Sequence, residues 1–266
     1  MASKINIVKI GGNIIDDENK LNQFLQDFAQ LPEQKVLIHG GGKIATEVAK
    51  KLGIEAQLVD GRRITDAEML KVVTMVYGGL VNKNIVAKLQ AYGCNALGLT
   101  GADANIIPAQ KRPVKTIDYG FVGDITAEKI QVKNLRLFVE NGLTPVIAPL
   151  THDGNGNLLN TNADTIASTV AVALAKSFVT KLTYCFEKKG VLANIEDENS
   201  VIHQITKKTY QTLKQDGTIV QGMIPKLDNA FSAIDAGVKS VFICHADDVL
   251  QILAKKEKAG TELVSG

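Results

Sequence analysis

The sequence has little cysteine, little net charge and no long apolar run, and each shortage excludes a class of protein. Its three cysteines, Cys94, Cys185 and Cys244, are far apart and form no C-x-x-C pair, which favours reduced thiols in a cytoplasmic protein. Lysine plus arginine number 30 against 28 acidic residues, so no nucleic-acid partner is expected. No apolar run reaches the ~18 residues of a membrane span, and the first residues do not resemble a signal peptide.

The four histidines, His39, His152, His203 and His245, show no metal-ligand spacing. No serine stands in a nucleophile-elbow context either. The sequence therefore predicts neither a protein-held metal nor a catalytic triad. We interpret His39 as a packed or hydrogen-bonded residue at the end of a strand.

The apolar pattern alternates between strands and helices for most of the chain. Residues 5–10 and 36–38 are short β-branched or apolar runs, and each is followed by glycines and a helical pattern. This β-α-β-α opening is typical of a parallel sheet with helices on both faces. We therefore predict the α/β class.

The remaining elements are predicted from turn, capping and periodicity signals. In chain order they are a hairpin over 57–64, a long helix opened by a capping box from Thr65 to Glu68 and broken near Gly78–Gly79, strands 95–99 and 145–150, helix 135–141, a helix capped by Asn162, strand 178–185, helices 207–215 and 225–236, and a last core strand over 238–244.

Lys9 is the first residue that suggests chemistry. It lies near the carboxyl end of the first strand, with Ile5 and Ile7 on the same face and Val8 and Ile10 on the other. An ammonium on an apolar strand is desolvated unless an anion meets it, and open α/β sheets bind ligands at this edge. A lysine that reaches back to water is the equal alternative.

Several other segments indicate an anionic ligand, each weakly. Gly40, Gly41 and Gly42 join a strand to a helix, where backbone N–H groups favour an anion, although a tight structural turn explains them equally well. Lys226 begins a helix, where a cation is electrostatically disfavoured, but a solvated lysine is the commoner explanation. Arg62 and Arg63 are expected on the hairpin, where they suit a carboxylate; exposed arginines are otherwise ordinary.

Taken together, five segments in order resemble the amino-acid kinase family, over nearly the whole chain. They are residues 9–12 (KIGG), 39–42 (HGGG), 60–65 (DGRRIT), 160–164 (NTNAD) and 222–226 (GMIPK). The resemblance implies a three-layer α/β/α sandwich with a mostly parallel central sheet and two lobes. Residues 1–160 would bind an acyl-glutamate and dimerise, and residues 161–266 would bind ATP.

The resemblance also implies roles for single residues. Lys9 and Lys226 match lysines that stabilise the transferred phosphoryl group, and Asp164 matches the carboxylate that holds them. Gly41, Gly42, Arg63 and Asn160 match substrate-binding positions, with Arg63 on a carboxylate. The phosphate- and nucleotide-binding positions are matched by Gly11, Gly12, Gly190, Gly222 and Met223.

The activity implied is ATP-dependent phosphorylation of the γ-carboxylate of N-acetyl-L-glutamate, a step of arginine biosynthesis, with Mg²⁺ accompanying ATP. A carboxylate of reference pKa about 4.3 is already a nucleophile at neutral pH, so charge stabilisation is the main requirement. N-succinyl-L-glutamate remains an open alternative acceptor. A non-catalytic amino-acid sensor, and kinases acting on carbamate, aspartate, glutamate or uridylate, are more remote.

Two departures from the family pattern bear on these expectations. Tyr184 stands where the family usually has an aspartate, and the loop that ends at Gly190 is longer, which leaves the adenine and ribose contacts open. The chain also begins at its first strand, without the N-terminal helix that hexameric, arginine-inhibited members use. A cytoplasmic homodimer without arginine feedback is therefore expected.

Overall fold

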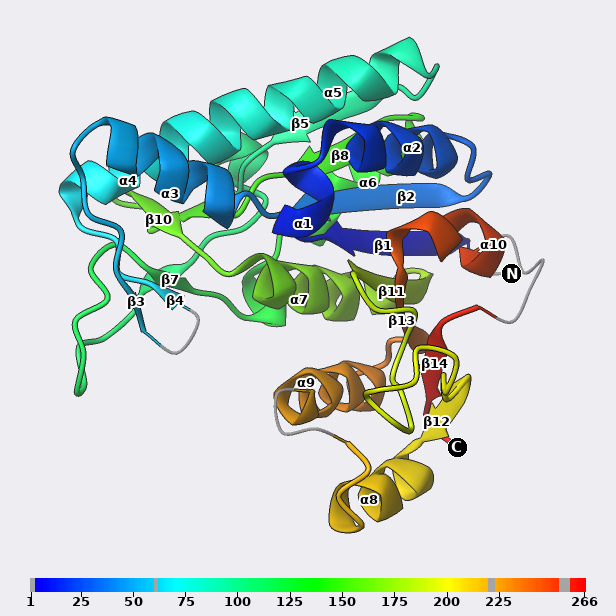
Figure 1. Ribbon diagram of the computed structural model, residues 1–266. Helices are drawn as coiled ribbons and strands as arrows, with labels where there is room; N and C mark the ends of the chain where they lie inside the picture. Colours follow the sequence, from blue (N-terminus) through cyan, green and yellow to red (C-terminus); the bar gives the residue numbers. More distant parts are fainter. Residues whose placement is uncertain (1–2, 60–61, 220–222, 254–258) are drawn as a thin grey trace.

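The computed structural model describes residues 3–59, 62–219, 223–253 and 259–266. These residues form one eight-stranded sheet with helices packed on both of its faces (Figure 1). Among the described residues, no helix is long and apolar enough to cross a membrane. Asp60, Gly61 and Gly222, which the sequence singled out, lie outside the described residues.

The strands are β1 (Lys4–Ile10), β2 (Gln34–His39), β3 (Leu58–Val59), β4 (Arg62–Arg63), β5 (Ala96–Leu99), β6 (Gln110–Lys111), β7 (Gly123–Asp124), β8 (Thr144–Ile147), β9 (Leu150–His152), β10 (Leu158–Asn160), β11 (Val179–Phe186), β12 (Gln204–Thr206), β13 (Ser240–His245) and β14 (Thr261–Val264). Short 3₁₀ segments are η2 (Asp103–Asn105), η3 (Ala127–Lys129) and η4 (Ala246–Asp248).

The helices are α1 (Gly12–Ile15), α2 (Glu18–Ala29), α3 (Gly42–Lys51), α4 (Ala67–Val73), the π-helical η1 (Thr74–Val81), α5 (Asn82–Ala91), α6 (Val132–Glu140), α7 (Ala163–Ala175), α8 (Lys207–Gln215), α9 (Ile224–Asp235) and α10 (Val249–Leu253). Nearly all of the elements expected from the sequence are present at closely similar positions.

The main sheet has the order β12-β14-β13-β11-β1-β2-β8-β5. The six strands from β13 to β5 are parallel, whereas β14 runs antiparallel to β13 and parallel to β12. Strand β1 lies between β2 and β11, so the carboxyl ends of all three meet at one edge. Strands from the first 160 residues form one half of the sheet and later strands the other half; the functional division at that point stays a prediction.

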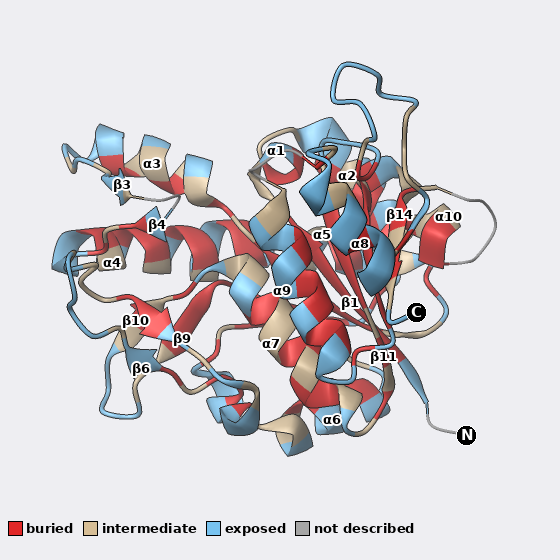
Figure 2. Cartoon of the chain, turned by 90° about the horizontal axis from the view of Figure 1, so that it is seen from below, coloured by how far each residue is buried: buried red, intermediate tan, exposed pale blue. Residues whose placement is uncertain are grey.

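Two apolar cores lie on opposite faces of the sheet. One packs α6, α7, α8 and α9 against Ile5 and Ile7, and the other packs α2, α3, α4, α5 and α10 against Val8 and Ile10. Figure 2 shows β1 buried between these layers. The three-layer α/β/α sandwich is therefore confirmed, as is the predicted division of β1 side chains between two faces.

Some local predictions were wrong. Asp66, not Thr65, caps α4, because its carboxylate accepts from the backbone N–H of Met69 while the Thr65 hydroxyl donates to the Arg63 carbonyl. The helix does not break at Gly78–Gly79; it widens there into η1, a π-helical segment that accommodates the glycines without ending the helix.

Two strand predictions also need correction. The expected strand over 145–150 is two strands, β8 and β9, separated at Ala148 and Pro149. The strand over 238–244 is not the last one, because β14 follows it and inserts between β13 and β12. Its four residues, Thr261–Val264, are too short to give a clear periodicity signal.

His39 anchors the end of β2 next to the glycine-rich loop. Its ring is fully buried, its Nδ1 donates to the Gly40 carbonyl at 2.7 Å, and its Nε2 accepts from Asn82 Nδ2 at 3.1 Å. Because a carbonyl oxygen can only accept, Nδ1 carries the proton and Nε2 is the acceptor. Burial lowers the pKa of His39 to about 4. The expectation of a packed, hydrogen-bonded strand-end histidine is confirmed.

Because the pKa of His39 is lowered in the folded protein, we predict that the protein loses stability in mild acid. In the unfolded chain its imidazole takes up a proton near pH 6.5, whereas in the folded chain it stays neutral until about pH 4. Its contribution to stability is therefore present above pH 6.5 and declines as the pH falls toward 4. Between pH 7 and pH 5 the free energy of unfolding should fall by about 2 kcal/mol from this group alone.

Urea unfolding of the wild type and of His39→Gln at pH 7 and pH 5 measures this effect. The glutamine keeps a donor and an acceptor but does not titrate, so its loss of stability between the two pH values should be smaller by about 2 kcal/mol. Equal losses in the two proteins would contradict the assignment.

Candidate active site

Lys9 meets a carboxylate at the carboxyl edge of the sheet. It is only 7% exposed and lies in register with Ile38 of β2 and Tyr184 of β11. Its Nζ is 2.7 Å from Oδ1 of Asp164, in the first turn of α7. Asn162 caps that helix as predicted, by accepting from the backbone N–H of Thr165. The ammonium therefore turns inward to an anion instead of reaching back to water.

Lys226 approaches the same place from the first turn of α9. Its Nζ is 4.0 Å from the centroid of the Phe186 ring, and Lys9 Nζ is 5.6 Å from that centroid. Burial lowers the pKa of Lys226; the Asp164 carboxylate opposes this effect and the Lys9 ammonium adds to it. The structure thus brings Lys9, Asp164 and Lys226 into one electrostatic cluster. Their catalytic roles stay a prediction.

Two aromatic side chains of β11, Tyr184 and Phe186, pack against this cluster. Their rings stack with centroids 6.0 Å apart, on the face of β11 that packs against α7. The Tyr184 hydroxyl donates to the backbone carbonyl of Asp164 at 3.3 Å, and burial raises its pKa. Tyr184 therefore contacts the backbone of Asp164, while the Phe186 ring lies under both ammonium groups.

Two glycine-rich loops lie next to each other at the same edge. The N–H of Gly40 donates to the carbonyl of Ile10 at 3.0 Å, which joins the loop after β2 to the loop after β1. Gly41 has φ +142°, and a Cβ there would approach the Tyr77 ring at 3.2 Å. A Cβ on Gly11 would meet Lys9 Nζ at 3.5 Å. The two loops therefore place backbone without side chains beside the lysine cluster, and α3 begins there with its N-terminus at Gly42.

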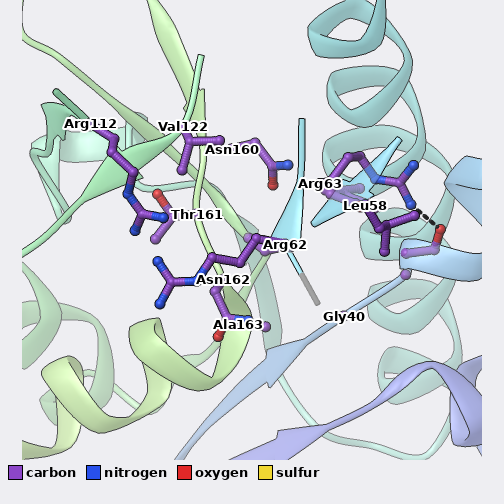
Figure 3. A pocket seen from close by; sticks show the side chains of 14 residues that line it. Gly40, Leu58, Arg62, Arg63, Arg112, Val122, Asn160, Thr161, Asn162 and Ala163 are labelled. Atoms are coloured by element: carbon purple, nitrogen blue, oxygen red, sulfur yellow. Dashed lines mark hydrogen bonds between the residues drawn. The ribbon is translucent and has the colours of Figure 1, made fainter. Parts of the chain in front are cut away.

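A cavity of about 200 Å³ opens beside these loops (Figure 3). Its walls come from the α3 N-terminus, the β3–β4 hairpin, η1, the β6–β7 hairpin and the β10–α7 connection. It is lined by Gly40, Gly41, Gly42, Leu58, Arg62, Arg63, Tyr77, Arg112, Val122, Pro149, Asn160, Thr161, Asn162 and Ala163. Asn162 and Ala163 of this lining are followed in the chain by Asp164, the acid of the lysine cluster.

Arg63 is buried at one side of this cavity. Its Nη2 donates to the Gly42 carbonyl at 2.8 Å and to the Thr46 hydroxyl at 2.7 Å. The same guanidinium counteracts the rise that burial causes in the pKa of Tyr77. Asn160 is fixed by donating to Thr65 Oγ1 at 3.0 Å. Thus all four residues predicted to bind substrate, Gly41, Gly42, Arg63 and Asn160, line one cavity, and their binding roles stay predictions.

The predicted nucleotide-binding residues are more dispersed. Gly11 and Gly12 lie at the sheet edge, next to Lys9 and Gly40. Met223 precedes α9 and is half-buried against one core. Gly190 is buried, and a Cβ there would lie 2.6 Å from Thr261 Oγ1. It therefore packs under β14, away from the cavity at Gly41, and its nucleotide role stays a prediction.

Sequence reasoning did not single out Tyr77, Arg112 or Phe186. Arg112 reaches the cavity because the β6–β7 hairpin folds back across the β10–α7 connection, a long-range placement with no local signal. Tyr77 reaches it from η1. Phe186 could have been found, because it is two residues from Tyr184 and strand alternation puts both on the face of Lys9.

The family of this chain follows from its sequence. The model of the amino acid kinase family matches residues 4–245, and the chain belongs to that family.

Among curated proteins, the chain is 61% identical to the acetylglutamate kinase of Cytophaga hutchinsonii, over 98% of this chain and 99% of that protein. It is 56% identical to the acetylglutamate kinase of Bacteroides thetaiotaomicron, over 99% of each. Among solved structures, smu.665 from Streptococcus mutans shares 28% identity with a TM-score of 0.76, covering 98% of this chain and 99% of that one.

Proposed function

We propose that this chain is an enzyme that transfers the γ-phosphoryl group of ATP to the γ-carboxylate of N-acetyl-L-glutamate, in arginine biosynthesis. The names of its close relatives support this activity. The observation that carries it is the cluster of Lys9, Asp164 and Lys226, whose acid directly follows Ala163, a residue in the wall of the cavity that Arg63 also lines. Two ammonium groups and one carboxylate leave a net positive charge for an incoming phosphoryl group.

The acceptor is held along the cavity wall. Arg63 pairs with its α-carboxylate through guanidinium N–H groups that are not used by Gly42 and Thr46, because the fork has five donors. The backbone at Gly41 and Gly42 and the amide of Asn160 orient the remaining polar atoms. With the α-carboxylate at Arg63, the γ-carboxylate points toward the end of the cavity where Ala163 leads to the lysine cluster.

The reaction forms one P–O bond and breaks another. A γ-carboxylate oxygen attacks the γ-phosphorus, the bond from that phosphorus to the β,γ-bridging oxygen breaks, and ADP leaves with the electron pair. The carboxylate is ionised at neutral pH, so no general base is required. Lys9 and Lys226 stabilise the charge on the transferred group, and Asp164 holds the two ammonium groups at a fixed separation.

ATP enters as its magnesium complex, so the metal is part of the substrate and is carried by phosphate oxygens. Gly11, Gly12 and Gly41 are the backbone donors proposed for those phosphates, since Gly11 lies beside Lys9 Nζ and Gly40 brings the two glycine loops together at the sheet edge. The half of the chain after residue 160 supplies Asp164, Lys226 and Met223, which supports its assignment as the ATP lobe. The half before it supplies Arg63 and most of the acceptor cavity.

The first prediction concerns Lys9→Ala. The charge of Lys9 is needed most in the transition state, so kcat should fall by about a hundredfold, while the KM for N-acetyl-L-glutamate changes little. Trapping the acyl phosphate with hydroxylamine in the presence of MgATP measures this turnover directly.

Lys4→Ala is the matched control, because Lys4 lies in the same strand but at its far, exposed end. Its kcat should stay within a few-fold of the wild type. A Lys9→Ala protein with near-normal kcat would remove the assigned role. A wild-type protein that binds N-acetyl-L-glutamate yet gives no hydroxamate would favour the sensor alternative.

We also propose that the chain forms a homodimer through the long helix α4-η1-α5. Met75 and Leu80 on η1 are 55% and 59% exposed. They are five residues apart, and π-helical i→i+5 geometry brings such residues to the same side. Exposed apolar side chains gathered in this way are typical of protein–protein contacts. The absence of arginine feedback remains a prediction.

Leu80→Arg should therefore convert the dimer to a monomer of 28.6 kDa. Light scattering coupled to gel filtration at micromolar concentration gives the mass. Leu137→Arg is the matched control, since Leu137 is also 59% exposed but lies on α6, across the sheet. A monomeric or hexameric wild type, or dissociation caused by Leu137→Arg alone, would refute this interface.

A cytoplasmic location belongs to the same proposal. Cys94, Cys185 and Cys244 are all buried and unpaired. Cys185 and Cys244 are register neighbours on β11 and β13 with sulfurs 4.0 Å apart, yet both remain thiols. Reduced cysteines of this kind are typical of the reducing compartments of the cell.

A further inference from the structure

The acceptor cavity contains more cationic groups than N-acetyl-L-glutamate requires. Arg62 and Arg112 line it together with Arg63, and no carboxylate is among the described residues that line it. Arg62 comes from β4, and Arg112 follows β6. Figure 3 shows the side chains of Arg62 and Arg112 directed to one side of the cavity and that of Arg63 to the other.

The two sides differ in how their charges are compensated. Arg63 is buried and held by Gly42 and Thr46. Arg112 pairs with Asp124, with Nε 3.0 Å from Oδ1, and lies over the Tyr119 ring. Arg62 is exposed and forms no ion pair with any residue in the described part of the chain. One guanidinium therefore faces the cavity with no anionic partner among the residues that the structure describes.

The acceptor proposed above has two carboxylates, and both already have partners. The γ-carboxylate must lie at Lys9 and Lys226 to react, and the α-carboxylate lies at Arg63. The uncharged acetyl group is the part left to face Arg62 and Arg112. A methyl group gains nothing from two guanidinium groups, whereas a carboxylate there would form charge-assisted hydrogen bonds.

The space beyond these arginines matches a longer acyl group. A second cavity, of about 660 Å³, shares Arg62 and Arg112 with the first and continues along Lys115, Thr116 and Tyr119. Its one carboxylate among the described lining residues is Asp124, the partner of Arg112, so the cations still outnumber the acid. Arg62 and Arg112 thus stand between the acceptor cavity and a larger space that carries a further lysine. An acyl chain that extends past the acetyl position has both room and positive charge in front of it.

We propose that Arg62 and Arg112 form a second anion subsite for N-acylglutamates whose acyl chain ends in a carboxylate, with N-succinyl-L-glutamate as the probe. The subsite rests on the proposed function, because it extends the acceptor site of that reaction. It adds an acceptor class to N-acetyl-L-glutamate and assigns the specificity for it to two residues outside the lysine cluster.

The test compares kcat/KM for N-succinyl-L-glutamate with that for N-succinamoyl-L-glutamate, in which a neutral amide replaces the terminal carboxylate. The two acceptors have the same shape and differ in one charge. In the wild type the succinyl compound should be favoured by about tenfold, as expected for a charge-assisted hydrogen bond at a partly exposed site. Hydroxylamine trapping with MgATP reports both reactions, and N-acetyl-L-glutamate is run alongside.

Variants then assign the preference to its residues. Arg62→Gln should bring the ratio of the two kcat/KM values toward one, and Arg112→Gln should lower it as well. Using a ratio within each protein cancels any loss of folded enzyme. Lys111→Gln is the control: Lys111 precedes Arg112 in the chain, but its ammonium lies over the Phe121 ring and it lines neither cavity. Its ratio should stay at the wild-type value.

A wild-type enzyme that phosphorylates N-acetyl-L-glutamate but does not distinguish the succinyl from the succinamoyl compound overturns the subsite alone. A preference that survives Arg62→Gln and Arg112→Gln overturns it too, since other residues would then bind the terminal carboxylate. No hydroxamate from any of the three acceptors overturns the proposed function, and the subsite with it.

Discussion

The ion pair between Lys9 and Asp164 is the interaction on which the rest of the candidate site depends. An ammonium on the central strand of a parallel sheet is stable only where an anion compensates its burial. Asp164 supplies that anion from the first turn of α7. Because the same carboxylate also acts on Lys226, two cations from distant parts of the chain share one place at the sheet edge. The carboxyl ends of β1, β2 and β11 then bring the glycine loops to them.

The cavity beside this ion pair has further cations at two places, Arg63 on one side and Arg62 with Arg112 on the other. Arg63 is buried and rigidly held, which suits a carboxylate that every acceptor of this type carries. Arg62 and Arg112 lie on two small hairpins at the mouth, where a variable acyl group would emerge. In the proposed function, the core elements hold the residues assigned to phosphoryl transfer, and the hairpins hold those assigned to the acyl group. This arrangement is common where loops vary on a constant scaffold.

The features that the sequence predicted correctly are those that depend on local patterns. The strand that carries Lys9, the helix that carries Lys226, the Asn162 cap and the burial of His39 all follow from periodicity, capping and turn chemistry. What it missed depends on long-range placement. Arg112 enters the cavity only through the fold of a hairpin, and β14 joins the sheet by pairing with strands far away in sequence. Within the π-helical segment, a Cβ on Gly78 would come within 3.3 Å of Leu150 and 3.6 Å of Thr100, a long-range approach that no local propensity contains.

The central claim is that Lys9, Asp164 and Lys226 interact electrostatically as one cluster, and NMR of the lysine side chains tests this most directly. Proteins labelled with ¹³C at lysine Cε give the pKa of Lys226 in the wild type and in Asp164→Asn, with Asp235→Asn as the control on an exposed ion pair. Since the Asp164 carboxylate raises the pKa of Lys226, its neutralisation should lower that pKa further below the value of an ordinary lysine. A pKa that is unchanged or raised in Asp164→Asn would contradict the account.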